Sequence, residues 1–269
     1  MSLLRLAAAF LRRDSRIAVS YRFPFLLGVL SILAALALFY YLGRLISPSA
    51  IESHSGFDRG YFAYAVLGLA LLQIVQAGLI SFSMKMRQEQ TTGTFEALMS
   101  TPASPSGVIL SSVTYDLIRS TVSSLFLIVL AIVVFGLRLD WSPDSLVAAT
   151  GALAGCLVLF ASLGIALAAF SVVFKQVTGL LAMVVTGLAL LGGVYFPLDV
   201  LPEPLRSLGN ILPFTWGLDT IRSALLNGTV DAPRLAGLVG SGLVAMPVAL
   251  VLFGMALQRA RRVGSLAQY

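Results

Sequence analysis

The chain consists of long apolar runs separated by short segments that carry nearly all of its charge. A helix needs about 20 apolar residues to cross a hydrocarbon core of about 30 Å, and six charge-free stretches meet this requirement or come close to it. They predict six transmembrane helices, at about residues 23–45, 60–84, 106–137, 145–174, 176–196 and 235–258. We therefore expect an all-α integral membrane protein with a single transmembrane domain over residues 1–269.

Two boundaries of these predicted helices depend on particular residues. The third helix begins before its charge-free run and carries Asp116 and Arg119 at one end. The fourth and fifth runs are separated by a single charge, Lys175. One helix over residues 145–196 would be about 78 Å long at 1.5 Å per residue, which no bilayer accommodates. A tight turn is therefore expected near Lys175.

Composition and charge agree with a membrane protein. Of 269 residues, 58% are hydrophobic and 11% charged, which excludes an ordinary soluble domain. A single cysteine, Cys156, excludes a disulfide scaffold. With both termini in the cytosol, twelve of the 18 Lys and Arg residues lie on the cytoplasmic side, as the positive-inside rule requires. The net charge of +6 is thus attributed to orientation in the cytoplasmic membrane, and no nucleic-acid partner is expected.

Residues 2–22 have the pattern of an amphipathic helix that lies in the membrane interface. Four basic side chains share one face, and apolar side chains occupy the opposite face. The basic residues of this face are Arg5, Arg12, Arg13 and Arg16. The helix either anchors the chain and sets its topology or surrounds a transport gate, and the pattern fits both interpretations equally well.

The segment between the second and third predicted spans favours a short cytoplasmic helix. Thr91 and Thr92 offer N-cap hydroxyls, Glu96 suits the positive end of a helix dipole, and Pro102 ends the element. Such a segment taken alone is also typical of an ordinary capped loop.

The segment between the fifth and sixth spans, residues 192–228, is too apolar for a solvated loop and contains four prolines. It predicts a re-entrant structure of one or two half-helices in the outer leaflet, or a lid that caps the bundle. The part around Asp219 to Leu226 predicts an interfacial helix in which Asp219 pairs with Arg222 at the i, i+3 spacing.

The predicted spans contain no charge near their centres, whereas ion-coupled transporters usually carry one there. The sole histidine, His54, lies in a predicted loop, and the pattern indicates neither a catalytic cluster nor a metal site. Gln73 and Gln76 share one face of the second span and either hold helices together or line a substrate pathway. Small residues such as Gly164 in the fourth span favour close helix packing.

Two segments resemble motifs of the type-two ABC exporter permeases. Residues 87–102, RQEQTTGTFEALMSTP, resemble the family's R-x-x-G-T-x-E-x-L-x-x-T-P loop, with a longer spacing between the Arg and the Gly. The later segment resembles the family's outer signature of a Gly and aromatic residues before Phe-Pro, followed by two Leu-Pro pairs and an Arg. The matching positions are Gly193, Tyr195, Phe196, Pro197, Leu201, Pro202, Leu212, Pro213, Phe214 and Arg222. The resemblance covers essentially the whole chain.

The resemblance implies roles for both segments. The first would be a coupling helix that docks on an ATPase subunit through Glu89, Gly93, Thr94, Glu96, Leu98, Thr101 and Pro102. The second would be an outer gate formed by Tyr195, Phe196, Pro197, Pro202, Pro213 and Phe214, and Gln73 and Gln76 are candidates for the pathway.

The resemblance also implies partners. Two permease copies, identical or closely related, would work in membrane lipid with two nucleotide-binding subunits, which would bind ATP and Mg. The chain agrees with this division of labour because its two lysines, Lys85 and Lys175, are not part of a phosphate-binding loop. We therefore expect a non-enzymatic permease subunit that exports an amphipathic or hydrophobic substrate such as a lipid, a drug or a lipid-linked glycan. The alternatives are an ATPase-independent secondary transporter or channel and a membrane-embedded assembly factor.

Overall fold

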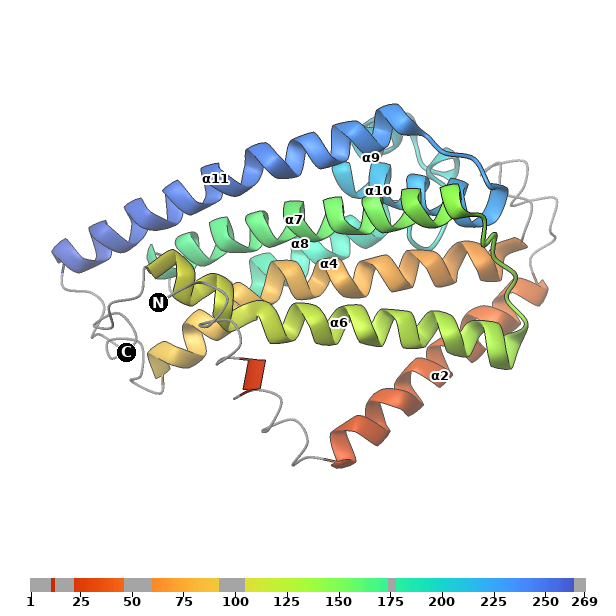
Figure 1. Cartoon of the computed structure of the whole chain (residues 1–269), viewed down its shortest axis with the longest axis horizontal. Coiled ribbons are helices and arrows are strands. Elements are labelled where there is room, and N and C mark those ends of the chain that lie inside the picture. Colours follow the sequence, from red (N-terminus) through yellow and green to blue (C-terminus); the bar gives the residue numbers. More distant parts are fainter. Residues whose placement is uncertain (1–10, 13–21, 46–59, 92–104, 174–177, 264–269) are drawn as a thin grey trace.

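The computed structural model describes residues 11–12, 22–45, 60–91, 105–173 and 178–263, and every regular element within them is a helix. The longer helices are α2 (Arg22–Leu45), α4 (Gly60–Thr91), α6 (Pro105–Phe135), α7 (Pro143–Val173), α8 (Thr178–Leu191) and α11 (Ala232–Val263). Figure 1 shows α4, α6, α7 and α11 side by side, with α2 diverging from them and α9 and α10 gathered at one end of the bundle. This end is called the α10 end below.

Within the described ranges, five helices are long and apolar enough to cross a membrane: α2, α4, α6, α7 and α11. The fifth predicted span, 176–196, corresponds to α8, which has 14 residues and is about 21 Å long. The prediction of a helix up to residue 196 is wrong, because α8 ends at Leu191. Gly193 has a φ of +72°, and the Val194 N–H donates to the Ala189 carbonyl at 3.3 Å, which closes the helix end.

Helix α4 is longer than its predicted span, since it continues from residue 84 to Thr91. Residues 85–90 are Lys, Met, Arg, Gln, Glu and Gln, which are all good helix formers, and the first glycine after them is Gly93. The 32 residues of α4 make a rod about 48 Å long, which exceeds the thickness of a hydrocarbon core. One continuous helix therefore joins the α10 end to the predicted coupling segment.

The core lies along α4, which is the most buried of the five long apolar helices and packs between α6 and α7. A β-carbon at Gly164 of α7 would collide with the Gly78 carbonyl oxygen of α4, so the two backbones touch. A β-carbon at Gly155 would meet Leu238 of α11 at 3.0 Å. The packing role predicted for small residues in the fourth span is thus seen at Gly155 and Gly164, whereas Gly187 of α8 has no neighbour within 4 Å.

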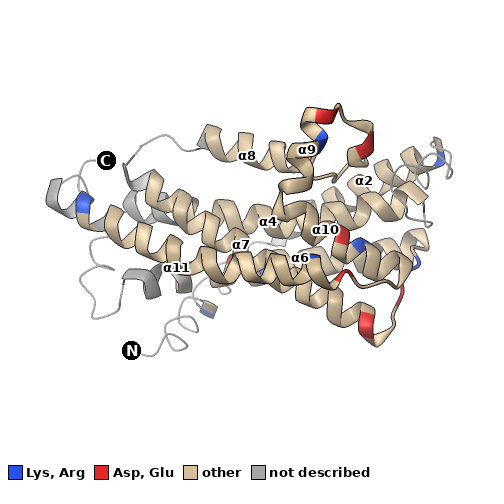
Figure 2. Cartoon of the chain, turned by 90° about the horizontal axis from the view of Figure 1, so that it is seen from above, with Lys and Arg blue, Asp and Glu red and all other residues tan. Residues whose placement is uncertain are grey.

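The acidic residues that the structure describes gather mostly at the α10 end (Figure 2). Most of the predicted interfacial helix, residues 2–10 and 13–21, lies outside the described residues. The same holds for the predicted coupling residues Gly93, Thr94, Glu96, Leu98, Thr101 and Pro102, and for His54. Glu89 lies in the last turns of α4.

Candidate functional site

Residues 192–228 form a compact helical segment at the α10 end, referred to here as the 192–228 segment. Its elements are the short 3-10 helix η1 (Leu198–Val200), α9 (Glu203–Ile211), α10 (Pro213–Arg222) and the π-helical turn η2 (Ser223–Asn227). The prolines start these helices: Pro202 is the N-cap of α9, and Pro213 is the first residue of α10. Proline suits these positions because its missing N–H has no partner in a first helical turn.

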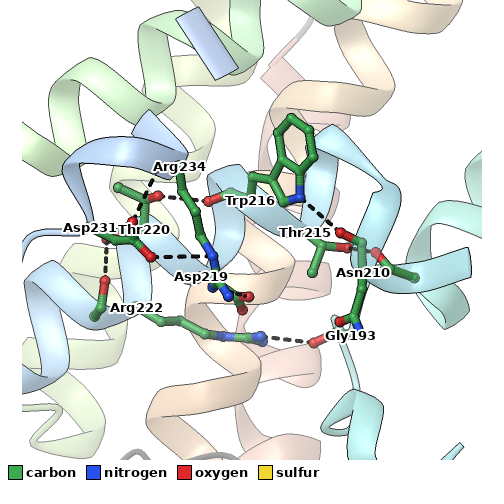
Figure 3. Close-up of polar contacts among 11 residues, drawn as sticks. Gly193, Asn210, Thr215, Trp216, Asp219, Thr220, Arg222, Asp231 and Arg234 are labelled. Atoms are coloured by element: carbon green, nitrogen blue, oxygen red, sulfur yellow. Dashed lines mark hydrogen bonds and ion pairs between the residues drawn. The ribbon is translucent and has the colours of Figure 1, made fainter. Parts of the chain in front are cut away.

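Two side chains of α10 join it to α9. The Thr215 hydroxyl donates to the Gly209 carbonyl and the Trp216 indole N–H to the Asn210 carbonyl, both at 2.8 Å (Figure 3). Carbonyls in the last turn of a helix have no partner within it, so these bonds satisfy the end of α9. The two helices are therefore expected to move as one unit.

Arg222 is the centre of the site. Its side chain is 1% exposed and reaches from the end of α10 to the backbone of two other elements. Its Nη1 donates to the Gly193 carbonyl at 2.9 Å, and its Nη2 donates to the carbonyls of Tyr64 at 2.8 Å and Val194 at 3.2 Å. Its Nε also donates to the Tyr64 carbonyl at 3.2 Å. One guanidinium thus connects α10 with the start of α4 and the end of α8.

Tyr64 completes this connection. Its hydroxyl donates to the Gly193 carbonyl at 2.8 Å, and its ring lies beneath the guanidinium, with the Arg222 Cζ 3.3 Å from the ring centroid. The quadrupole of an aromatic ring attracts a cation over its face. The charge of Arg222 is therefore compensated by carbonyl dipoles and a ring.

A small residue on α4 makes room for these contacts. A β-carbon at Gly68 would lie 2.7 Å from the Val194 carbonyl oxygen and 2.9 Å from Nη2 of Arg222. Gly68 is one helical turn after Tyr64, so the two residues lie on the same face of α4. Neither Tyr64 nor Gly68 is among the residues predicted from the sequence, although an aromatic residue and a glycine at this spacing near the end of a predicted span are a visible signal.

The predicted Asp219–Arg222 pair is wrong. Asp219 pairs with Arg234 of α11 at 3.0 Å, and Asp231 also pairs with Arg234, at 3.2 Å (Figure 3). Arg222 does not pair with Asp219 because its guanidinium donates to carbonyls of α4 and of the turn after α8. Burial raises the pKa of the Asp219 carboxyl, although both arginines act to lower it. Burial lowers the pKa of Arg222 from its usual value, while Tyr64 and Asp219 oppose this change.

The interfacial helix predicted around Asp219 to Leu226 is also corrected. This stretch includes the end of α10 and the π-helical turn η2, and most of its side chains are buried. The chain turns at Gly228, whose φ is +69°, and the Asp140 N–H donates to the Leu225 carbonyl at 2.7 Å. The segment is packed into the end of the bundle and does not lie on its surface.

Apolar contacts hold α10 against α7. Phe214 is fully buried, meets Phe160 edge to face at 6.0 Å and leaves no room for a side chain at Gly192. Gly217 lies directly against the Sγ of Cys156. The cysteine is therefore covered by α10.

The other predicted gate residues occupy different surroundings. Tyr195 stacks on Phe39 of α2, with ring centroids 6.1 Å apart. Phe196 is half-buried, Pro197 is buried and Pro202 is exposed. The predicted gate residues therefore do not form one cluster: Tyr195 faces α2, whereas Phe214 packs on Phe160 of α7.

A cavity of about 610 Å³ lies within this site. Its wall includes Tyr64, Gly193 and the carboxylates of Asp199, Asp219 and Asp231. The cavity therefore directly adjoins the contacts of Arg222, and its lining carries more acidic than basic side chains.

Gln73 and Gln76 lie further along α4. The Nε2 of Gln73 donates to the Ser123 hydroxyl of α6 at 2.8 Å, which is a contact between two helices. Gln76 is half-buried and does not line the cavity described above. The helix-joining interpretation therefore has a direct contact for Gln73, while a pathway role for either residue stays a prediction.

A family model described as ABC-2 type transporter matches residues 8–226, a range that includes both the predicted coupling segment and almost all of the 192–228 segment. The chain therefore belongs to the ABC-2 type transporter family, as its sequence motifs suggested. It is a multi-pass transmembrane permease component and not the ATPase of the transporter, and permeases of this family normally work with ATPase subunits. No curated protein gives a significant match to the chain.

Proposed function

We propose that the chain is the membrane-spanning subunit of an ATP-driven exporter and that α4 transmits force from the ATPase to the 192–228 segment. The observation that carries this proposal is the continuity of α4. Its first turns hold Arg222 through the Tyr64 carbonyl and leave space for it at Gly68, and its last turns contain Glu89 and lead directly into residues 92–102. A movement at one end of this rod therefore reaches the other.

The proposed cycle begins with ATP binding to two nucleotide-binding subunits, which also hold Mg. Their closure would push on the segment with Gly93, Thr94, Glu96, Leu98, Thr101 and Pro102, and Glu89 would extend the contact along α4. A shift of α4 would change the position of Tyr64 relative to Gly193 and Arg222. The 192–228 segment would then have two arrangements, one before and one after the shift, and the position of α4 would decide which of them is more stable. ATP acts by binding one conformation more tightly than the other, which shifts their populations.

The proposed cargo is amphipathic or hydrophobic, such as a lipid, a drug or a lipid-linked glycan. The centres of the five long apolar helices carry no charged side chain, which suits an apolar molecule better than a free ion. The 192–228 segment would be the outer gate, facing away from the cytosol, and the cavity of about 610 Å³ beside it would receive the departing polar group. A second permease copy would complete the pathway between the two subunits in the cytoplasmic membrane.

The coupling part of this proposal is tested by Glu96→Arg in the permease–ATPase complex. Reversing the charge should abolish transport and the stimulation of ATP hydrolysis by substrate, while the variant still reaches the membrane. Thr92→Ser is the matched control, because it keeps the hydroxyl of the predicted N-cap in the same segment and should leave both activities intact. Normal transport and normal stimulated hydrolysis in Glu96→Arg would show that this segment does not couple the two subunits.

The gate part is tested separately by Phe196→Ala. Phe196 is half-buried, so its truncation should spare the fold while changing the rate of transport and of substrate-stimulated ATP hydrolysis. Pro202→Ala is the control, since Pro202 is exposed on the same segment. Unchanged transport in Phe196→Ala would reduce the 192–228 segment to a cap of the bundle.

A further inference from the structure

A second cavity lies between α4 and α6, away from the α10 end. It has a volume of about 410 Å³, is referred to here as the α4–α6 groove, and is bounded by residues from Gln73 to Lys85 on α4 and from Asp116 to Ser123 on α6. Among the described residues, none of the 192–228 segment contributes to it. The transport mechanism proposed above leaves this groove without a role.

The mouth of the groove carries a cation that has no partner within the described part of the chain. Arg119 is exposed, and no hydrogen bond or ion pair joins it to another described residue. Lys85 and Asp116 lie beside it, with Nζ and Oδ2 3.9 Å apart. The formal charge of these three side chains is +1, so the mouth favours an anion.

The surface around Arg119 is apolar. Ile118 and Val122, which flank it on α6, are 46% and 59% exposed, and Met84 on the facing side of the groove is 47% exposed. An arginine surrounded by exposed apolar side chains on a membrane-spanning helix lies where acyl chains end and headgroups begin. The anion that meets Arg119 must therefore be compatible with an apolar surrounding.

The inner end of the groove is polar. Gln73 donates to Ser123 at 2.8 Å, while the other amide atom of Gln73, Oε1, is buried and has no partner among the described residues. A buried acceptor without a donor is unfavourable. Arg119 and Ser123 are one helical turn apart, about 6 Å along the axis. Ala77 and Ile80 form an apolar wall beside this polar pair.

We propose that the α4–α6 groove binds one anionic phospholipid. The phosphate contacts Arg119 at the mouth, an ester oxygen of the glycerol backbone accepts a hydrogen bond from the Ser123 hydroxyl, and the acyl chains run inward against Val122 and the apolar wall of Ala77 and Ile80. A free phosphate ion would satisfy Arg119 and leave the apolar surface uncovered, so the chemistry favours a lipid.

The test is a lipid titration of the purified full chain in neutral detergent, followed by native mass spectrometry. Phosphatidylglycerol should occupy a first site more tightly than phosphatidylcholine with the same acyl chains. Arg119→Ala should weaken that site for phosphatidylglycerol about fivefold, the factor expected for one basic side chain at a membrane surface. Asp116→Asn should tighten it. Opposite effects of these two variants cannot come from a common loss of folding.

Two further measurements distinguish a bound lipid from a free anion and from a protein interface. Arg138→Ala removes an exposed cation beyond the other end of α6 and should leave the first site unchanged. Inorganic phosphate in hundredfold excess should not displace the lipid. The proposal fails if the two lipids bind equally well or if Arg119→Ala has no effect. It also fails if phosphate displaces the lipid, or if Arg119→Ala separates a dimer while lipid binding persists, since the groove would then be an anion site or a protein interface.

Discussion

The guanidinium of Arg222 lies over the ring of Tyr64, with Cζ 3.3 Å from the ring centroid. The two residues are 158 positions apart in the chain, and their contact joins α10 to the start of α4. A planar guanidinium with five N–H donors can reach several carbonyls while its face stacks on a ring, whereas a lysine ammonium cannot. This contact makes the position of the 192–228 segment depend on the position of α4.

Loss of Arg222 should destabilise the α10 end strongly. Arg222→Met leaves the Val194 carbonyl without its donor, which costs about 1–3 kcal/mol, and also removes the cation from the face of the Tyr64 ring, while the Gly193 carbonyl keeps the Tyr64 hydroxyl. Arg206→Met is the matched control, because Arg206 pairs with Asp199 on the surface at 43% exposure, and such pairs contribute about 0–1 kcal/mol. The sole cysteine, Cys156, is buried beneath α10, so its reaction with a thiol dye during heating reports the undocking of α10. If thiol-dye labelling of Cys156 had the same midpoint temperature in both variants, Arg222 would not hold α10 in place.

Gly68→Ala should destabilise the site by about 1–3 kcal/mol, because its β-carbon would crowd the Val194 carbonyl oxygen and Nη2 of Arg222. Gly187→Ala in α8 meets no atom within 4 Å and should be neutral or slightly stabilising, since alanine favours a helix. The same thiol-dye melting measurement compares the two variants. If Gly68→Ala melted no earlier than Gly187→Ala, the close approach of α4 and Arg222 would not exist in the protein.

Phe214→Ala should lower the free energy of unfolding by about 3–5 kcal/mol, as is typical of a large buried aromatic residue. The truncation leaves a cavity where the Phe214 ring packs against Phe160 and Gly192. Phe196→Ala should cost clearly less, since the Phe196 side chain is only half-buried. Melting of both purified variants checks this order. The reverse order would mean that Phe196, and not Phe214, anchors the 192–228 segment.

The sequence reveals the long helices because each of them needs an unbroken apolar run, which shows directly in the pattern of charges. Their ends are less visible. Helix α4 passes its predicted end because residues 85–90 are mostly polar and yet strong helix formers, while α8 stops early because Gly193 takes a positive φ inside an apolar stretch. Hydropathy alone does not distinguish these cases.

The contacts of the candidate site were even less predictable from the sequence than the helix ends. The motif predicted that Arg222 is important, and the local spacing favoured Asp219 as its partner. The actual partners are carbonyls of Tyr64, Gly193 and Val194, which reach Arg222 only when α4 and α8 pack against α10. Asp219 then meets Arg234, which a neighbouring helix supplies. Partners that depend on tertiary packing cannot be found from i, i+3 spacing.

The most direct test of the account is reconstitution of the permease in proteoliposomes with and without its ATPase subunits. Export of a labelled amphipathic cargo should require the ATPase, ATP and Mg²⁺, and a Walker-lysine variant of the ATPase subunit should abolish it. An imposed proton or sodium gradient should not replace ATP. Cargo movement by the permease alone, driven by an ion gradient, would contradict the central claim that this chain is the membrane half of an ATP-driven exporter.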